Sequence, residues 1–152
     1  MLKPGLWIAA CVFLLDQATK VLMLEVVMVP PRPIEVTPFF NLVIVWNRGV
    51  SFGLFSDLGW GPWPLVAMTG AIVAGLLVWL GRTKERWLGL ALGLVIGGAL
   101  GNVVDRMIFG AVFDFLDVHA AGYHWPAFNV ADAAISLGVV AIVADSLFSR
   151  RR

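Results

Sequence analysis

The sequence predicts an all-α membrane protein with four transmembrane helices and a small outer-surface β-sheet between the first two. Hydrophobic residues make up 60% of the 152 residues and charged residues only 14%, whereas a soluble domain carries about 25% charged residues. Mean hydropathy is +0.88. Four apolar stretches are long enough to cross about 30 Å of hydrocarbon. We place them near residues 4–24, 62–80, 87–104 and 130–148, within a single membrane domain spanning residues 1–152.

The placement of lysine and arginine predicts how these helices are oriented. Cytoplasmic connections carry an excess of basic residues. With the N-terminus inside, seven of the eleven basic residues are cytoplasmic: Lys3, Arg82, Lys84, Arg86, Arg150, Arg151 and Arg152. We therefore expect both termini in the cytoplasm and the two long connections, 25–61 and 105–129, on the outer side. The net charge of +1 leaves no basic surface suited to nucleic acid, which excludes that class of partner.

The first long connection, residues 25–61, is predicted to form the sheet. Its segment FFNLVIVWN (39–47) is rich in β-branched and aromatic residues, which favour a strand. NRG (47–49) is typical of a turn, and VSFGLF (50–55) is predicted to be a return strand. We expect this sheet to lie on the outer membrane surface, with apolar side chains touching lipid.

Glycines recur along the third apolar stretch. They are Gly89, Gly93, Gly97 and Gly101, with Gly98 in addition. Positions four residues apart rotate by only about 40° around a helix, so these glycines form one continuous groove. Small residues at this spacing let helix backbones approach closely in lipid. The pattern predicts that the third helix packs tightly against its neighbours.

Polar residues near the membrane gather toward the outer ends of the helices. A charge in hydrocarbon costs at least about 2.5–3.5 kcal/mol, so each should have a partner or a task. Asp16 and Lys20 are four residues apart on one helical face and are predicted to pair, in a structural or a functional role. Asn102, Asp105 and Arg106 cluster on one side of the third helix, where Arg106 could hold a carboxylate through two parallel hydrogen bonds.

Two carboxylates are the strongest candidates for chemistry. Asp132 lies in the first turn of the fourth helix, where the helix dipole stabilises an anion; alone, it would be explained as a cap. Asp114 lies in the preceding connection, within the apolar stretch AVFDFL. Two acids in a low-dielectric site do not both ionise easily, so one keeps its proton. Such a pair can activate water with one carboxylate and protonate a carbonyl or leaving group with the other.

The remaining ionisable residues carry little signal. Asp117 is interpreted as a solvated loop charge and Asp145 as a helix-end charge near the cytoplasmic side. His119 and His124 lack the spacing of a metal-binding motif and have no cysteine partners. The sequence therefore predicts neither a metal site nor a cofactor.

The polar residues fall in five sequence blocks that together resemble one known family. In chain order the blocks are DQATK (16–20), NRGVSF (47–52), GGALGNVVDR (97–106), VFDF (112–115) and FNVAD (128–132). The chain resembles the lipoprotein signal peptidases (signal peptidase II), a bacterial family of small four-helix membrane aspartyl proteases. The resemblance covers essentially the whole chain.

The resemblance implies an aspartic endopeptidase that removes signal peptides from diacylglyceryl-modified prolipoproteins, at the amino side of the lipidated cysteine. It implies that Asp114 and Asp132 are catalytic. It also implies a set of residues that shape the site and hold the substrate: Asp16, Lys20, Asn47, Gly49, Asn102, Asp105, Arg106 and Asn129. Membrane lipid and globomycin-type inhibitors are the other implied partners. The implied location is the bacterial cytoplasmic (inner) membrane, with the sheet and active site on the periplasmic side.

Three other interpretations are weighed against this one. A small transporter or channel subunit would need ionisable groups lining a path to both sides, whereas Asp145 is the acid expected in the inner half. A non-catalytic membrane scaffold would use the glycine groove to bind a partner. An intramembrane aspartyl protease of the presenilin type would carry a GxGD signature, which this sequence does not contain.

Overall fold

The computed structural model describes residues 2–49 and 61–149. Within these ranges, four long α-helices form a bundle: α1 (Leu2–Leu22), α2 (Trp63–Arg82), α3 (Arg86–Phe109) and α4 (Val130–Ser149). Each is long and apolar enough to cross a membrane, and α1 continues directly into the short π-helix η1 (Met23–Val27). Together with the antiparallel sheet described below, these helices confirm the predicted fold class.

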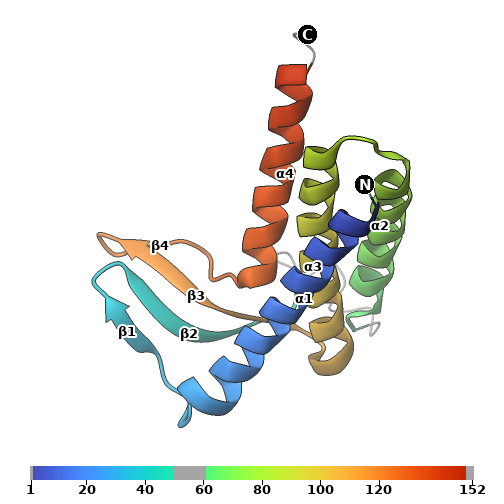
Figure 1. Cartoon of the computed structure of the whole chain (residues 1–152). Helices are drawn as coiled ribbons and strands as arrows, with labels where there is room; N and C mark the ends of the chain where they lie inside the picture. The colour runs from blue at the N-terminus through green and yellow to red at the C-terminus, as the bar shows by residue number, and fades with distance from the viewer. Residues whose placement is uncertain (1, 50–60, 150–152) are drawn as a thin grey trace.

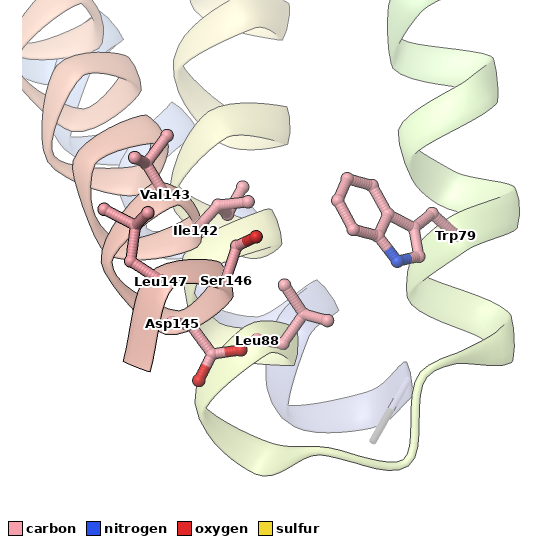
Figure 2. A pocket seen from close by; sticks show the side chains of 7 residues that line it. All are labelled: Trp79, Leu88, Ile142, Val143, Asp145, Ser146 and Leu147. Atoms are coloured by element: carbon pink, nitrogen blue, oxygen red, sulfur yellow. The ribbon is translucent and has the colours of Figure 1, made fainter. Parts of the chain in front are cut away.

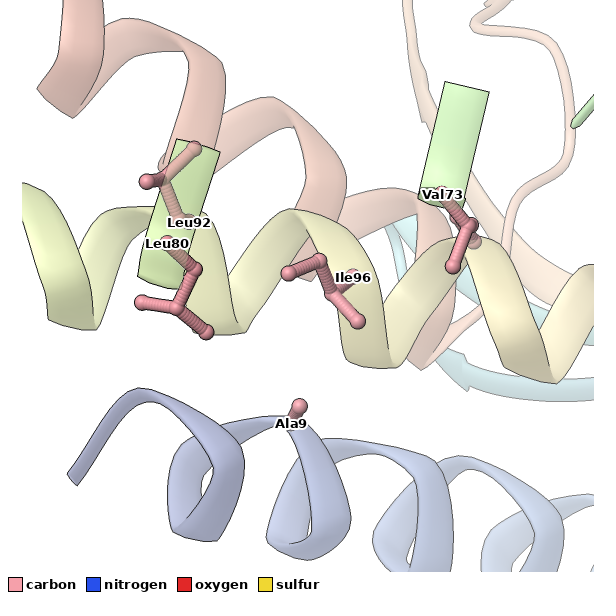
Figure 3. Close-up of a cluster of buried hydrophobic side chains, with 6 residues drawn as sticks. Ala9, Val73, Leu80, Leu92 and Ile96 are labelled. Carbon is pink, nitrogen blue, oxygen red and sulfur yellow. The ribbon is translucent and has the colours of Figure 1, made fainter. Parts of the chain in front are cut away.

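Helix α3 is the centre of the bundle and packs against the other three helices (Figure 1). It is mostly buried within the protein, whereas less than a fifth of the residues in the membrane-spanning parts of α1, α2 and α4 are buried, as expected for helices that face lipid. Leu92 and Ile96 of α3 form a fully buried cluster with Leu80 of α2 (Figure 3). This cluster joins the α2–α3 hairpin to α1, which contributes Ala9.

The glycines of α3 bring the backbones of α1 and α4 close to it. A Cβ atom on Gly97 would lie 2.5 Å from the Ala9 carbonyl oxygen of α1. On Gly98 it would overlap the Ala131 carbonyl oxygen of α4. Side chains larger than hydrogen do not fit at these positions without moving a neighbouring helix. The predicted close packing of the third helix is confirmed.

Replacing Gly98 with alanine should therefore displace the beginning of α4. The added methyl group would overlap Ala131 O and lie 2.9 Å from Ile135 Cγ1. We expect the free energy of unfolding to fall by about 1–3 kcal/mol, the usual cost of overpacking. Thermal unfolding in detergent measures the change. The matched control is Gly75→Ala on α2, where no described atom lies within 4 Å; it should be neutral or up to about 1 kcal/mol stabilising.

The sheet is antiparallel, and its described strands follow the order β1 (Ile34–Thr37), β2 (Phe40–Asn47), β3 (Val112–Ala120), β4 (Tyr123–His124). The predicted strand at 39–47 is confirmed as β2. Its predicted return strand, 50–55, lies outside the described residues. Among the described residues, β2 pairs with β1 on one side and with β3 on the other. Strand β3 comes from the connection between α3 and α4, where the sequence predicts a loop. Because β2 and β3 are far apart in the chain, local patterns do not reveal their pairing.

Apolar side chains attach the sheet to the helices. Phe113 and Phe115 of β3 pack with Met28, just beyond η1, and all three are buried. Trp46 of β2 stacks in tilted geometry on Phe113 and on Phe109 of α3, each at 5.3 Å between ring centroids. The sheet extends from one end of the bundle, while α1 begins and α4 ends at the other (Figure 1).

The end of the bundle away from the sheet contains a separate cavity of about 340 Å³. Figure 2 shows Trp79 of α2 on one side, Leu88 of α3 below, and side chains near the end of α4 opposite. Asp145 and Ser146 lie at the α4 wall. The other polar residues singled out by the sequence lie toward the opposite end, where the sheet joins the helices.

Candidate active site

The candidate site is built around Asn129, which immediately precedes α4. Its side-chain Nδ2 donates a hydrogen bond to Asp114 Oδ1 at 2.8 Å. Its backbone nitrogen donates to Asp132 Oδ2 at 3.2 Å, and Asp132 N donates back to Asn129 Oδ1 at 2.9 Å. The reciprocal pair is a capping box, which satisfies two of the free amides at a helix start. One asparagine therefore links the two acids that the sequence selected.

Two further asparagines complete the amide contacts. Asn102 of α3 donates to Asp132 Oδ1 at 2.8 Å and accepts from Asn129 Nδ2 at 3.2 Å. Asn47, the last residue of β2, donates to Asp114 Oδ2 at 3.1 Å. Each of the four carboxylate oxygens thus accepts a hydrogen bond from an asparagine. Uncharged donors fix the orientation of both carboxylates while leaving their charges uncompensated by a direct ion pair.

Asp114 is the more deeply buried acid, with a relative exposure of 1%. Its pKa is raised from 3.8 to about 6, mainly by burial and also by the negative charge of Asp132, while the hydrogen bonds from Asn47 and Asn129 oppose the shift. Asp132 is partly exposed at the beginning of α4. The pair therefore combines a carboxyl group that retains its proton toward neutral pH with a second carboxylate that solvent can reach.

A buried charge cluster lies beside the two acids. Lys20 Nζ contacts Asp16 Oδ2 and Asp105 Oδ2, each at 2.8 Å. The three residues have relative exposures of 4%, 0% and 1%. The predicted Asp16–Lys20 pair is confirmed, and Asp105 joins it from α3. Buried charges are tolerated when they are paired and hydrogen-bonded, and this cluster carries a net charge of −1.

Both carboxylates of this cluster also bind the backbone beside the candidate catalytic acids. Asp16 Oδ1 accepts the amide of Ala131 at 2.9 Å, one residue before Asp132. Asp105 Oδ2 accepts the amide of Phe113 at 3.1 Å, one residue before Asp114. Lys20 bridges the two carboxylates and therefore fixes the beginning of α4 relative to the beginning of β3.

Gln17 belongs to the same cluster, although the sequence analysis did not select it. Its Nε2 donates to Asp16 Oδ2 at 3.1 Å and to Asp105 Oδ1 at 3.0 Å. Helical spacing places Asp16 and Lys20 on one face and gives no reason to expect Gln17, the immediate neighbour of Asp16, beside them. The long Gln17 side chain nevertheless reaches the Asp105 carboxylate on α3. Its position within the DQATK block was the sequence feature that could have identified it.

Arg106 and Gly49 lie at the edge of the site. Arg106 is close enough to Asp114 and Asp132 to interact electrostatically with both. Its recorded hydrogen bond runs from Nη1 to the Asn102 carbonyl oxygen at 3.3 Å, not to a carboxylate as the sequence suggested. Its Nε is buried without a hydrogen-bond partner among the described residues. A guanidinium group has five N–H donors, so Arg106 retains donors beyond the one that binds Asn102 O.

Gly49 allows the chain to turn beside this arginine. Its φ angle is +79°, in the left-handed region that glycine adopts most readily. Its amide donates to Asn47 Oδ1 at 2.8 Å, so the turn also orients the asparagine that holds Asp114. A Cβ at this position would lie 2.6 Å from Leu65 Cδ1 and 3.2 Å from Arg106 Nη2.

Asp117 is not the solvated charge that the sequence suggested. Its relative exposure is 6%, because it lies on β3 opposite Asn41 of β2. It accepts hydrogen bonds from Asn41 Nδ2 at 2.9 Å and contacts His124 Nδ1 at 2.9 Å. The contact with His124 lowers the pKa of Asp117. These side chains hold the far part of the sheet together and do not contact the candidate acids.

Taken together, the site and the fold define a class of protein. A four-helix membrane bundle presents two carboxylates, held by amide donors, where the bundle meets a sheet, and one of them has a raised pKa. Carboxyl pairs with different proton affinities perform general acid–base hydrolysis. The class is a membrane hydrolase of the aspartic type.

The sequence model of the family described as Signal peptidase (SPase) II matches residues 8–148, and the chain belongs to this family. The protein is therefore a protease, as the sequence resemblance implied. It is 50% identical over 147 residues to a lipoprotein signal peptidase of Methylobacterium radiotolerans, covering 95% of this chain and 86% of the relative. It is 43% identical over 150 residues to that of Aeromonas hydrophila, covering 97% and 90%.

Solved structures agree with the fold. One, described as a bacterial membrane enzyme determined by the in meso method, superposes with a TM-score of 0.81 at 31% identity and covers 96% of this chain and 88% of its own. A second of the same description gives a TM-score of 0.79 at 32% identity, with coverages of 94% and 92%. These values show that the chain shares its fold with both structures.

Proposed function

We propose that this membrane protease removes the signal peptide of prolipoproteins at the amino side of a diacylglyceryl-modified cysteine, with Asp114 and Asp132 as its catalytic pair. Membership of the signal peptidase II family supports the substrate class. The observation that carries the catalytic assignment is the position of Asn129, which hydrogen-bonds to both carboxylates at once. The proton-retaining environment of Asp114 gives the pair the asymmetry that hydrolysis needs.

In the proposed reaction the ionised carboxylate takes a proton from water while the protonated carboxyl group donates a hydrogen bond to the scissile carbonyl. The water oxygen bonds to the carbonyl carbon, giving a tetrahedral intermediate. The carbon–nitrogen bond then breaks, and a proton from the pair passes to the departing amine of the lipidated cysteine. Because coupled acids titrate as a unit, the shared proton belongs to the pair as a whole.

Arg106 and Asn47 are proposed to position the substrate. The Nε of Arg106 has no hydrogen-bond partner among the described residues, so it could donate a hydrogen bond to a substrate carbonyl that reaches it. Asn47 orients Asp114 through Nδ2 and holds the Gly49 turn through Oδ1, so binding at that turn would be transmitted to the acid.

We further propose that the enzyme lies in the bacterial inner membrane with the sheet and the catalytic pair on the periplasmic side. The basic residues between α2 and α3, at the end of the bundle away from the sheet, favour a cytoplasmic location for that end. Exposed aromatic residues beside the strands, such as Phe39 in the β1–β2 turn and Trp125 just after β4, suit the membrane–water interface. The scissile bond would then be reached by periplasmic water while the lipid remains in the bilayer.

The proposed pair predicts how activity depends on pH. The active form holds one proton between two carboxylates, and the pKa of Asp114 is raised from 3.8 to about 6. As pH rises through that value the shared proton is lost, so kcat/KM should decrease on the alkaline side, by about tenfold per pH unit at the limit. Initial rates measured from about pH 4.5 to about pH 9 on one lipidated precursor test this. A rate that keeps rising above pH 8 would contradict it.

The function is tested with purified protein and two precursors that differ only in whether the cysteine carries diacylglycerol. We expect cleavage of the lipidated precursor alone, before the cysteine, and inhibition by globomycin. Cleavage of both precursors would refute lipid recognition. Failure to cleave either, together with substrate flux in liposomes, would favour the transporter class instead.

A further inference from the structure

An apolar groove leads away from Asp132 along the lipid-facing side of α4. Its volume is about 490 Å³. Ala133, Ser136 and Leu137 of α4 form one side, and the extended segment that carries Trp125 and Phe128 forms the other. Asp132 stands at one end, and Leu137 is 64% exposed to the surroundings. The groove is therefore continuous with the proposed catalytic centre and open toward lipid.

The shape of the groove selects among possible occupants. From Asp132 to Leu137 the helix rises by about 7.5 Å, so the groove runs from the helix start toward the interior of the bilayer. A helical peptide is about 10–12 Å across with its side chains and would need a channel between two helices. This groove lies between one helix and one extended segment, which suits a single flexible chain. Its lining carries no cation among the described residues, so it is unsuited to a phosphate group.

We propose that this groove receives an acyl chain of the diacylglyceryl group on the substrate cysteine. The proposal rests on the proposed function, in which the lipidated cysteine follows the scissile bond directly. The lipid is attached to the sulfur of that cysteine. It must therefore lie next to the catalytic centre and extend away from it. The groove is an apolar path that begins at a proposed catalytic carboxylate.

The groove acts by alignment more than by hydrophobic affinity. An acyl chain entering it leaves lipid, not water, so transfer from water contributes little. A chain held along α4 fixes the cysteine relative to Asp132, and small misplacements of a reacting group lower rates substantially. The small Ser136 side chain keeps the middle of the groove open.

The test compares dipalmitoyl and dibutyryl versions of one precursor, cleaved by the wild-type enzyme and by Ser136→Trp. The indole should block the groove about one helical turn from Asp132. For the long-chain substrate we expect kcat/KM to fall about tenfold or more. For the short-chain substrate the loss should be at most about twofold, because short chains gain little alignment from the groove and can lie outside it. Leu137→Ala, which removes an apolar wall without adding bulk, should give a smaller loss of the same selectivity.

Leu14→Trp on α1 is the matched control, because Leu14 is 63% exposed and is not part of the groove. It should leave both substrates unaffected. Equal losses on the long-chain and short-chain substrates in Ser136→Trp, or no loss on either, would overturn the groove assignment. Those outcomes leave wild-type cleavage intact, whereas failure of the proposed function would appear as absence of cleavage by the wild-type enzyme.

Discussion

Replacing Asp114 or Asp132 with asparagine should reduce prolipoprotein cleavage by at least about 10³-fold, because each substitution removes the acid or the base from a pair that acts as a unit. The amide keeps the size of the side chain, and the helices that surround it do not depend on its charge. The variants should therefore accumulate in the membrane. Cleavage of a diacylated precursor, followed by gel shift, measures the effect.

The Asp114 substitution should also make the protein more stable. A folded-state pKa of about 6, against 3.8 for a free carboxyl group, means that ionised Asp114 destabilises the fold above pH 6 and not below pH 3.8. The difference corresponds to about 3 kcal/mol. An asparagine retains only part of the hydrogen bonding from Asn47 and Asn129, so we expect a gain of about 1–3 kcal/mol at neutral pH. Loss of activity with raised thermal stability would distinguish a catalytic role from a structural one.

Asp117→Asn is the matched control for both measurements. Asp117 lies on the same strand, three residues from Asp114, and is also buried. Its contacts are with Asn41 and His124, so cleavage should persist while stability falls by about 1 kcal/mol. Loss of activity in this variant, with cleavage retained in Asp114→Asn, would mean that the catalytic acid had been misassigned.

Lys20→Met should produce the largest loss of stability in the protein. The substitution leaves Asp16 and Asp105 buried without the ammonium group that both contact at 2.8 Å. Removing one partner of a buried ion pair costs about 3–5 kcal/mol, and here two anions lose the same partner. Activity should fall as well, because these carboxylates hold the amides of Ala131 and Phe113. Thermal unfolding in detergent and precursor cleavage are the two measurements.

Adding Asp16→Asn to Lys20→Met should restore part of the stability, because one uncompensated charge is removed. The coupling energy between the two sites, obtained from a double-mutant cycle, isolates the ion pair from other effects of each substitution. Lys84→Met, at an exposed lysine between α2 and α3, is the matched control and should change stability by no more than about 0.5 kcal/mol. Comparable losses at positions 20 and 84 would show that the buried cluster contributes nothing specific.

The helices could be predicted from sequence because their signals are local. Apolar length defined them, and the four-residue spacing of glycines such as Gly93 and Gly97 indicated close packing that the structure confirms. Asp16 and Lys20 could be paired for the same reason, since a helix brings residues four apart together. The resemblance of five blocks then identified the family, which the matches to curated relatives confirm.

The sheet and the hydrogen bonds of the site could not be derived in this way. The pairing of β2 with β3 joins Val45 to Asp114 across most of the middle of the chain, and no local pattern encodes it. Asp117 was misinterpreted for that reason, since its burial depends on Asn41 from another strand. Gln17 was missed because its importance lies in a contact with Asp105 on α3. For both residues the decisive partner is distant in the chain, and the sequence does not show which distant residues come into contact.

The ties from Asp16 to α4 and from Asp105 to β3 have a consequence for biogenesis. A ribosome delivers α1 and α3 to the membrane before it has made the residues that these carboxylates hold, and the last of those, Ala131, belongs to α4. A nascent chain halted before α4 lacks Asp132 and the capping asparagine together. The proposed catalytic pair is therefore complete only after the ribosome has made the beginning of α4.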